Sequence, residues 1–96
     1  MGFDWDEDKR LENLRKHGLD FRDAHLVLDS TVLTELDFRF DYGEIRFYTI
    51  GLLNGTTVVI SHTETSISFR VISFRRAEKY EEERYYKAIR DGLGEN

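Results

Sequence analysis

The spacing of apolar side chains in the first third of the chain predicts two short helices. Asp6 is a typical helix N-cap, and Gly18 lies where a left-handed residue ends a helix that runs to about His17. Asp20 favours a second helix start. The residues behind it have the i, i+3, i+4, i+7 spacing of one apolar stripe: Phe21, Ala24, His25 and Leu28. We expect this second helix to end near Asp29.

The apolar period changes to two at Val32, and the alternation through Phe40 predicts a half-buried strand. Asn54-Gly55 is a strong signal for a type I′ hairpin, because both residues tolerate positive φ. Three further strands are expected at 45–53, 56–63 and 67–74, separated by turns at 41–44, 54–55 and 64–66. Strands joined by such short turns pair as an antiparallel meander.

The segment from Arg75 to about Asp91 is rich in helix formers and predicts a last helix that Gly92 ends. Arg75 and Arg76 then lie in its first turn, where the helix dipole disfavours cations. The complete pattern is two N-terminal helices, a four-stranded antiparallel meander and a C-terminal helix, which is an α+β fold. The 96 residues fit a single domain, 1–96, without a repeat or linker.

The composition excludes several kinds of functional site. The chain has no cysteine, which excludes disulfides, Cys-based zinc sites and thiol nucleophiles. Its three histidines are scattered at 17, 25 and 62 without a metal-ligand spacing, so we expect no metal and no cofactor. The charged N-terminus does not resemble a signal peptide, and no apolar run reaches membrane-spanning length. A cytoplasmic protein without membrane contact is expected.

The net charge of −5 argues against nucleic-acid binding by overall attraction. The charge is uneven, because residues 1–44 carry six Lys and Arg against twelve Asp and Glu, whereas residues 45–96 carry eight against seven. A local basic patch therefore remains compatible with the composition. Direct DNA binding by this acidic chain alone is not expected.

The arginines are the sharpest chemical signal, because a guanidinium offers five donors that match phosphate oxygens in pairs. By strict alternation Arg70 shares a face with Ile72 and Phe74, whereas Arg75, if the strand runs on, lies with Val71 and Ser73. Arg70 and Arg75 are then expected on opposite faces. In a four-stranded sheet, Arg46 and His62 can converge with Arg70 on one face. Such a cluster favours a bound anion, and a phosphodiester is the natural candidate. Surface ion pairs with Glu78 or Glu82 explain the arginines equally well.

A second candidate patch lies on the first helix. Lys9, Asn13 and Lys16 have the spacing of one helix face, with His17 at its edge. An ordinary solvated face explains the same pattern. His25 belongs to the apolar stripe and reads as a core histidine.

Three blocks of the sequence resemble the BrnT toxin family. F-D-W-D-E-D-K-R-L-E-N-L-R-K-H-G-L-D-F-R-D-A, residues 3–24, is similar to the family pattern F-x-W-D-x-x-K-x-x-x-N-x-x-K-H-G-V-x-F-x-x-A. The positions that match are Phe3, Trp5, Asp6, Lys9, Asn13, Lys16, His17, Gly18, Phe21 and Ala24. Residues 41–51 and 70–86 resemble the second and third blocks. Leu19 replaces the usual valine, and Phe74 replaces the more usual alanine.

The resemblance implies a bacterial type II toxin with a RelE-like fold, which cleaves RNA without a metal. It also implies a cognate BrnA-like antitoxin, with which the toxin forms a heterotetramer. On this reading the catalytic residues are Arg46, His62, Arg70, Arg75 and Arg76, and the substrate-binding residues are Lys9, Lys16 and His17. Arginine is a poor proton acceptor, which leaves His62, His17 or Glu44 as proton carriers. His62 is the first choice.

A different class of function is also compatible with the sequence. The arginines and the glutamate-rich segment 78–83 are suited to binding a partner protein without cutting RNA. The tyrosines at 80, 85 and 86 are suited to stacking on bases or to packing the last helix on the sheet.

Overall fold

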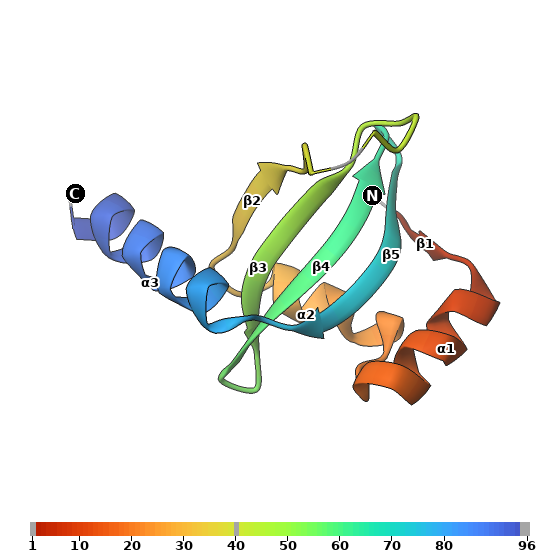
Figure 1. Ribbon diagram of the computed structural model, residues 1–96, viewed down its shortest axis with the longest axis horizontal. Coiled ribbons are helices and arrows are strands. Elements are labelled where there is room, and N and C mark those ends of the chain that lie inside the picture. The colour runs from red at the N-terminus through yellow and green to blue at the C-terminus, as the bar shows by residue number, and fades with distance from the viewer. Residues whose placement is uncertain (1, 40, 95–96) are drawn as a thin grey trace.

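The structure, a computed structural model, describes residues 2–39 and 41–94 (Figure 1). Along the chain the helical elements are α1 (Glu7–His17), the 3-10 turn η1 (Phe21–Asp23), α2 (Ala24–Leu28) and α3 (Lys79–Gly94). The strands are β1 (Gly2–Trp5), β2 (Leu33–Leu36), β3 (Phe47–Leu53), β4 (Thr56–Glu64) and β5 (Ser68–Arg76). None of the described helices has the length and apolar character needed to cross a membrane.

The α+β class is as predicted, but the predicted four-stranded antiparallel meander is wrong. The sheet has five strands in the order β1-β5-β4-β3-β2, and β1 pairs in parallel with β5. The sheet is therefore mixed, and the arrangement begins with a strand rather than with two helices. Four residues carry too short a pattern to reveal β1, and its pairing with β5 joins opposite ends of the chain.

The helix ends follow the local signals. The Asp6 carboxylate accepts a hydrogen bond from the N–H of Lys9 at 3.1 Å, and Gly18 ends α1 with φ 71°. Asp20 accepts from the N–H of Arg22 at 2.9 Å. The helix predicted after Asp20 begins as the 3-10 turn η1 and continues as α2 to Leu28.

The 54–55 hairpin is confirmed, with φ values of 51° at Asn54 and 80° at Gly55. The strand predicted from Val32 to Phe40 is shorter, because β2 ends at Leu36; Phe40 lies outside the described residues. A polar turn replaces its second half. There the Asp37 carboxylate accepts hydrogen bonds from Arg39 at 2.8–3.1 Å.

The junction between the last strand and the last helix differs most from the prediction. β5 continues through Arg76, and α3 begins only at Lys79 and continues past Gly92. Arg75 and Arg76 are therefore strand residues, so neither lies at the positive end of a helix dipole. The N–H of Glu78 donates to the Glu81 carboxylate at 2.8 Å, which fixes the true helix start.

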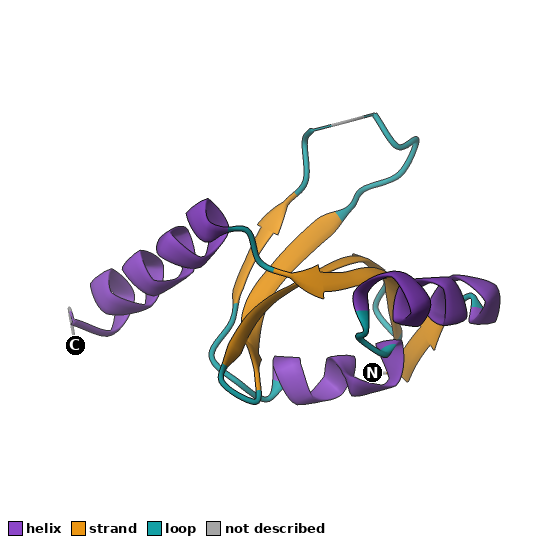
Figure 2. Ribbon diagram, turned by 60° about the horizontal axis from the view of Figure 1, so that its bottom comes forward, coloured by secondary structure: helices purple, strands orange, loops and turns teal. Residues whose placement is uncertain are grey.

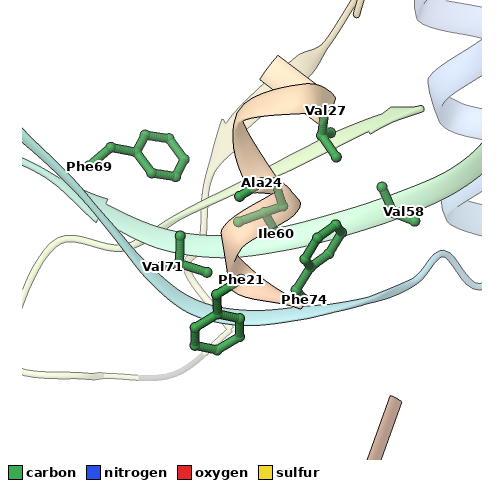
Figure 3. Close-up of a cluster of buried hydrophobic side chains, with 8 residues drawn as sticks. All are labelled: Phe21, Ala24, Val27, Val58, Ile60, Phe69, Val71 and Phe74. Carbon is green, nitrogen blue, oxygen red and sulfur yellow. The ribbon is translucent and has the colours of Figure 1, made fainter. Parts of the chain in front are cut away.

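Two clusters of buried side chains form the core, one on each face of the sheet. On the face that we call the α2 face, residues of η1, α2, β4 and β5 pack together (Figure 3): Phe21, Ala24, Val27, Val58, Ile60, Phe69, Val71 and Phe74. Gly51 permits this close packing, since a Cβ there would lie 2.7 Å from the Cγ1 of Val27. On the opposite α3 face, Ile50 and Val59 pack with Tyr85 of α3. Figure 2 shows α1 and α2 close to the sheet and α3 apart from both.

Candidate nucleic-acid interface

A β-bulge in β5 decides which side chains share a face. Val71 is paired with His62 and Ser73 with Ser61, so one strand has an extra residue between these pairs. Val71 and Phe74 consequently both lie in the α2-face cluster, although strict alternation would separate them. Their neighbours Arg70, Ser73 and Arg75 therefore face the α3 side together. The predicted grouping of Arg70 with Phe74 is wrong, and so is the predicted placement of Arg70 and Arg75 on opposite faces, because alternation does not survive the bulge.

A row of hydroxyl groups crosses the α3 face beside these arginines. Tyr48 on β3 is paired with Ser61 on β4, and Ser61 is paired with Ser73 on β5. In the next row, Thr63 is paired with Arg70. All these side chains are half-buried. The fully buried side chains of this face, Ile50, Val59 and Tyr85, lie under α3 and form a separate cluster. The α3 face thus combines an apolar area under α3 with a polar strip beyond it.

Three of the predicted arginines have a carboxylate partner of their own. Arg70 pairs with Asp4, its neighbour in the parallel register of β1 and β5. Arg46 lies 3.3 Å from Glu44, and its guanidinium carbon is 4.0 Å from the centre of the Tyr42 ring. These pairs reduce the positive field that an RNA strand meets on this face.

Arg75 is held most firmly, because its two terminal nitrogens donate to the Glu81 carboxylate at 2.7 and 2.9 Å. Burial by itself raises the pKa of Glu81, but the bonds from Arg75 and from the N–H of Glu78 outweigh it, so the pKa is lowered overall. The bond to Glu81 likewise raises the pKa of Arg75. The pair is therefore ionised, and Arg75 keeps its Nε–H available in a fixed orientation.

His62 lies on the opposite face from Arg70 and is completely buried. Its ring stacks between Phe47 and Phe69, with centroid distances of 5.7 and 4.1 Å, and its Nε2 is 2.7 Å from the Oγ1 of Thr49. Nδ1 lies 3.4 Å from a Glu64 oxygen without a hydrogen bond. Burial lowers the pKa of His62 to about 4. The ring is therefore neutral at pH 7 and is a part of the core.

Acid should destabilise the fold through His62. Its pKa is about 4 when folded and 6.5 in the unfolded chain, so the unfolded state alone takes up the proton as the pH falls below 6.5. Between pH 7 and pH 5 we expect the free energy of unfolding to fall by about 2 kcal/mol more than in His62→Gln. Urea unfolding at both pH values measures this difference. Equal pH dependence in the two proteins would show that His62 gains its proton readily in the folded state.

Arg76 leaves the sheet on the α2 side, opposite to Arg75. One of its terminal nitrogens lies 3.5 Å from the backbone oxygen of His17, at the end of α1. No carboxylate in the described part of the chain pairs with it. The predicted convergence of Arg46 and His62 with Arg70 on one face is wrong, because His62 is buried on the opposite face. The five residues predicted to be catalytic do not meet at one place: Arg46, Arg70 and Arg75 each pair with a separate carboxylate, and Arg76 lies on the α2 side.

The remaining predicted residues meet in a groove where α1 crosses β5. Asn13 fixes this crossing, because its side-chain amide donates to the backbone oxygen of Phe74 at 2.8 Å and accepts from the Phe74 N–H at 3.1 Å. The side chain thereby replaces a neighbouring strand beyond the end of β1. Beside it lies a groove of about 360 Å³, which we call the α1–β5 groove; its lining is Asp8, Lys9, Glu12, Asn13, Lys16, His17, Ile72 and Ser73.

The α1–β5 groove holds two lysines without a described carboxylate partner. Lys9 and Lys16 are exposed and form no ion pair within the described residues. Glu12 is already paired with Arg15, which lowers the pKa of Glu12. His17 is half-buried and lines the same groove as Ser73. An anion of the size of a phosphate group would therefore meet two lysines, an imidazole and a hydroxyl here, with the Asp8 and Glu12 carboxylates in the same lining.

The comparison with protein families decides the identity. The model of the ribonuclease toxin BrnT of type II toxin–antitoxin systems matches residues 5–81. The chain belongs to the BrnT family. As a type II toxin family it implies an RNA target and an antitoxin partner. A comparison with curated proteins found no match.

The BrnT family match spans α1, the groove and β5, and it ends at the partner of Arg75, Glu81. Of the residues predicted to bind substrate, Lys9, Lys16 and His17 come together in this BrnT-family structure, and Arg76 contacts the backbone of the last of them. Sequence reasoning missed the side chains that complete the face: Arg39, Tyr48, Ser61, Ser73 and Arg84. Alternation along β3 and β4 could have predicted that Tyr48 and Ser61 share a face. It could not predict the position of Ser73, because the bulge in β5 shifts the register.

Proposed function

We propose that this chain is a metal-independent endoribonuclease toxin of the cytoplasm that cleaves RNA in the α1–β5 groove. The observation that carries the proposal is the meeting of Lys9, Lys16 and His17 with Ser73, on the only described face where unpaired lysines adjoin a histidine. Membership of a ribonuclease toxin family supports the substrate class. Because Arg15 already neutralises Glu12, Lys9 and Lys16 supply the local attraction for RNA in spite of Asp8 and of the net charge of −5.

Metal-free cleavage of RNA proceeds by attack of the 2′-oxygen on the adjacent phosphorus and departure of the 5′-oxygen. It needs a base that takes the 2′-hydroxyl proton, cations that stabilise the charged phosphorane, and an acid that protonates the leaving oxygen. We assign the base to His17, because His62 is buried and Glu44 is engaged by Arg46. His25, which was predicted to be a core residue, is exposed on α2 instead, and its Nδ1 lies 2.8 Å from the backbone oxygen of Arg22.

Lys9 and Lys16 are suited to the developing charge on the phosphorane, since each ammonium group is exposed in the groove. Arg75 is suited to a neighbouring phosphate, because Glu81 fixes its orientation while one N–H stays available. Arg70 and Ser73 lie on the same face and extend this path. Arg76 acts as a positioning residue for the end of α1 through the backbone of His17.

The partner in this proposal is a cognate BrnA-like antitoxin that neutralises the toxin and joins it in a heterotetramer. The support is the description of the family as part of a type II toxin–antitoxin system. In this proposal the antitoxin, and not this chain, binds DNA, because the net negative charge of this chain repels a duplex.

The test is cleavage of total RNA by the purified chain in EDTA, with Lys16→Gln compared with Lys87→Gln. Lys87 is an exposed lysine of α3 outside the groove. We expect Lys16→Gln to slow cleavage about 10- to 100-fold, because a lost bond to a charged group costs about 1.5–3 kcal/mol. Lys87→Gln should cleave at the parent rate.

Three results would contradict the proposal. Intact RNA under all conditions would favour a protein-binding module without enzymatic activity. Cleavage that EDTA abolishes would show a metal-dependent reaction. Equal rates in Lys16→Gln and in the parent would place the reaction outside the α1–β5 groove or reveal a contaminating nuclease.

A further inference from the structure

A second hollow lies at the other end of the hydroxyl row, between the segment after β2 and the start of α3. We call it the tyrosine pocket; its volume is about 400 Å³ and its lining is Leu36, Asp37, Phe38, Arg39, Tyr48, Tyr80, Glu81 and Arg84. Glu81 is also the partner of Arg75. The pocket therefore adjoins the arginine that we assign to a phosphate neighbouring the cleaved bond.

Aromatic faces and guanidinium groups form the walls of the tyrosine pocket. Phe38 and Tyr80 are 82% and 60% exposed, so their rings are available to a ligand. The guanidinium carbons of Arg39 and Arg84 each lie 6.0 Å from the centre of the Tyr48 ring. Flat π surfaces beside guanidinium planes are the surfaces on which unpaired bases stack.

The polar groups of the pocket are fixed before any ligand arrives. Arg39 donates to Asp37 at 2.8 and 2.9 Å, and the Arg39 bond is the main reason that the pKa of Asp37 is lowered. Arg84 pairs with Glu35 and donates to the Tyr48 hydroxyl at 3.0 Å. Donors and acceptors held in this way suit the edge of a base, which presents both kinds of group. A purely apolar protein segment would not use the remaining hydrogen-bonding capacity of these groups.

The hydroxyl row connects this pocket with the α1–β5 groove. Tyr48 lines the pocket and Ser73 lines the groove, with Ser61 between them in register. Two strand spacings separate the ends of the row, which is about 10 Å. A single RNA strand of a few nucleotides can span both hollows along this row.

We propose that the tyrosine pocket binds one unpaired base of the RNA substrate, close to the cleaved bond, by stacking on the exposed ring of Tyr80. Occupation of the pocket selects which phosphodiester enters the α1–β5 groove. This inference rests on the proposed ribonuclease function, and it assigns to that function a site for substrate selection. The ligand class is a nucleobase in single-stranded RNA.

The experiment is single-turnover cleavage of short single-stranded RNAs in which one base at a time, on either side of the cut, is replaced by an abasic site. With the parent chain we expect one position at which the abasic substitution slows cleavage about 10- to 100-fold. Tyr80→Ala should slow cleavage of the intact RNA similarly and lose its sensitivity to that position. Tyr80→Phe, which keeps the ring, should behave as the parent chain, and so should Tyr86→Ala, the control on α3.

Each other outcome is decisive. Suppose that RNA is cut, but that the rate reductions caused by Tyr80→Ala and by the abasic site multiply when the two changes are combined. The base then does not stack on Tyr80, so the pocket proposal fails while the ribonuclease function stands. The same holds if Tyr80→Ala keeps the parent cleavage pattern and loses only antitoxin binding, which assigns the pocket to a protein. If the parent chain neither cuts RNA nor binds an uncleavable 2′-O-methyl RNA, the proposed function and the pocket fail together.

Discussion

Replacing His17 by glutamine is expected to lower the rate of RNA cleavage about 10²- to 10⁴-fold, which is the usual contribution of a positioned general base. Glutamine keeps the length and polarity of the side chain but cannot take up a proton near neutral pH. His17 is half-buried at the end of α1 and holds no described salt bridge, so the fold should tolerate the change. Single-turnover kinetics and thermal unfolding measure the two effects separately.

The matched control is His25→Gln, since His25 is an exposed histidine of α2 away from the groove. It should cleave RNA at the parent rate. His17→Ala with added imidazole distinguishes a general base from a residue that only positions the substrate. Free imidazole can replace a lost base in the space that alanine leaves. Rescue of cleavage supports the proton carrier. Parent-like activity in His17→Gln would remove His17 from the chemistry.

Replacing Asn13 by alanine is expected to lower the free energy of unfolding by about 2–4 kcal/mol. The buried amide forms hydrogen bonds with both backbone groups of Phe74 and with the backbone oxygen of Leu19, at 2.8–3.1 Å. Alanine leaves these groups unpaired where α1 covers the edge of β5, and each buried unpaired group costs about 1–3 kcal/mol. Water that enters beside α1 offsets a part of this loss.

Urea unfolding measures the effect, with Lys9→Ala as the control on the same helix face. Lys9 is exposed, so its truncation should change stability by less than about 0.5 kcal/mol. Asn13→Ala should also reduce RNA cleavage, because the α1–β5 groove loses its fixed wall. A stability loss as small as that of Lys9→Ala would show that the Asn13 bonds do not hold α1 on the sheet.

Local signals in the sequence predicted the local features of the fold. Asp6 and Gly18 bound α1, and Asn54-Gly55 form the tight turn, because caps and type I′ turns depend on a few neighbouring residues. The start of α3 was placed four residues early, since Arg75 and Arg76 have a helix-compatible composition. Pairing with β4 keeps both of them in the strand.

The parts of the site that depend on pairing between distant strands could not be predicted from the sequence. β1 joins β5 across most of the chain, and this pairing brings Asp4 to Arg70 and supplies the carboxylate that the sequence pattern did not reveal. The bulge in β5 likewise depends on the fit between two strands, so alternation could not indicate that Arg70, Ser73 and Arg75 share a face. Lys9, Lys16 and His17 were predicted together because helical spacing is local.

The most direct measurement is a crystal structure of the chain with a short 2′-O-methyl RNA, in which the blocked 2′-oxygen prevents cleavage. One phosphate should lie within hydrogen-bond distance of Lys16 and His17, with the blocked 2′-oxygen next to the imidazole. An RNA strand bound elsewhere, with the α1–β5 groove free of phosphate, would contradict cleavage in this groove.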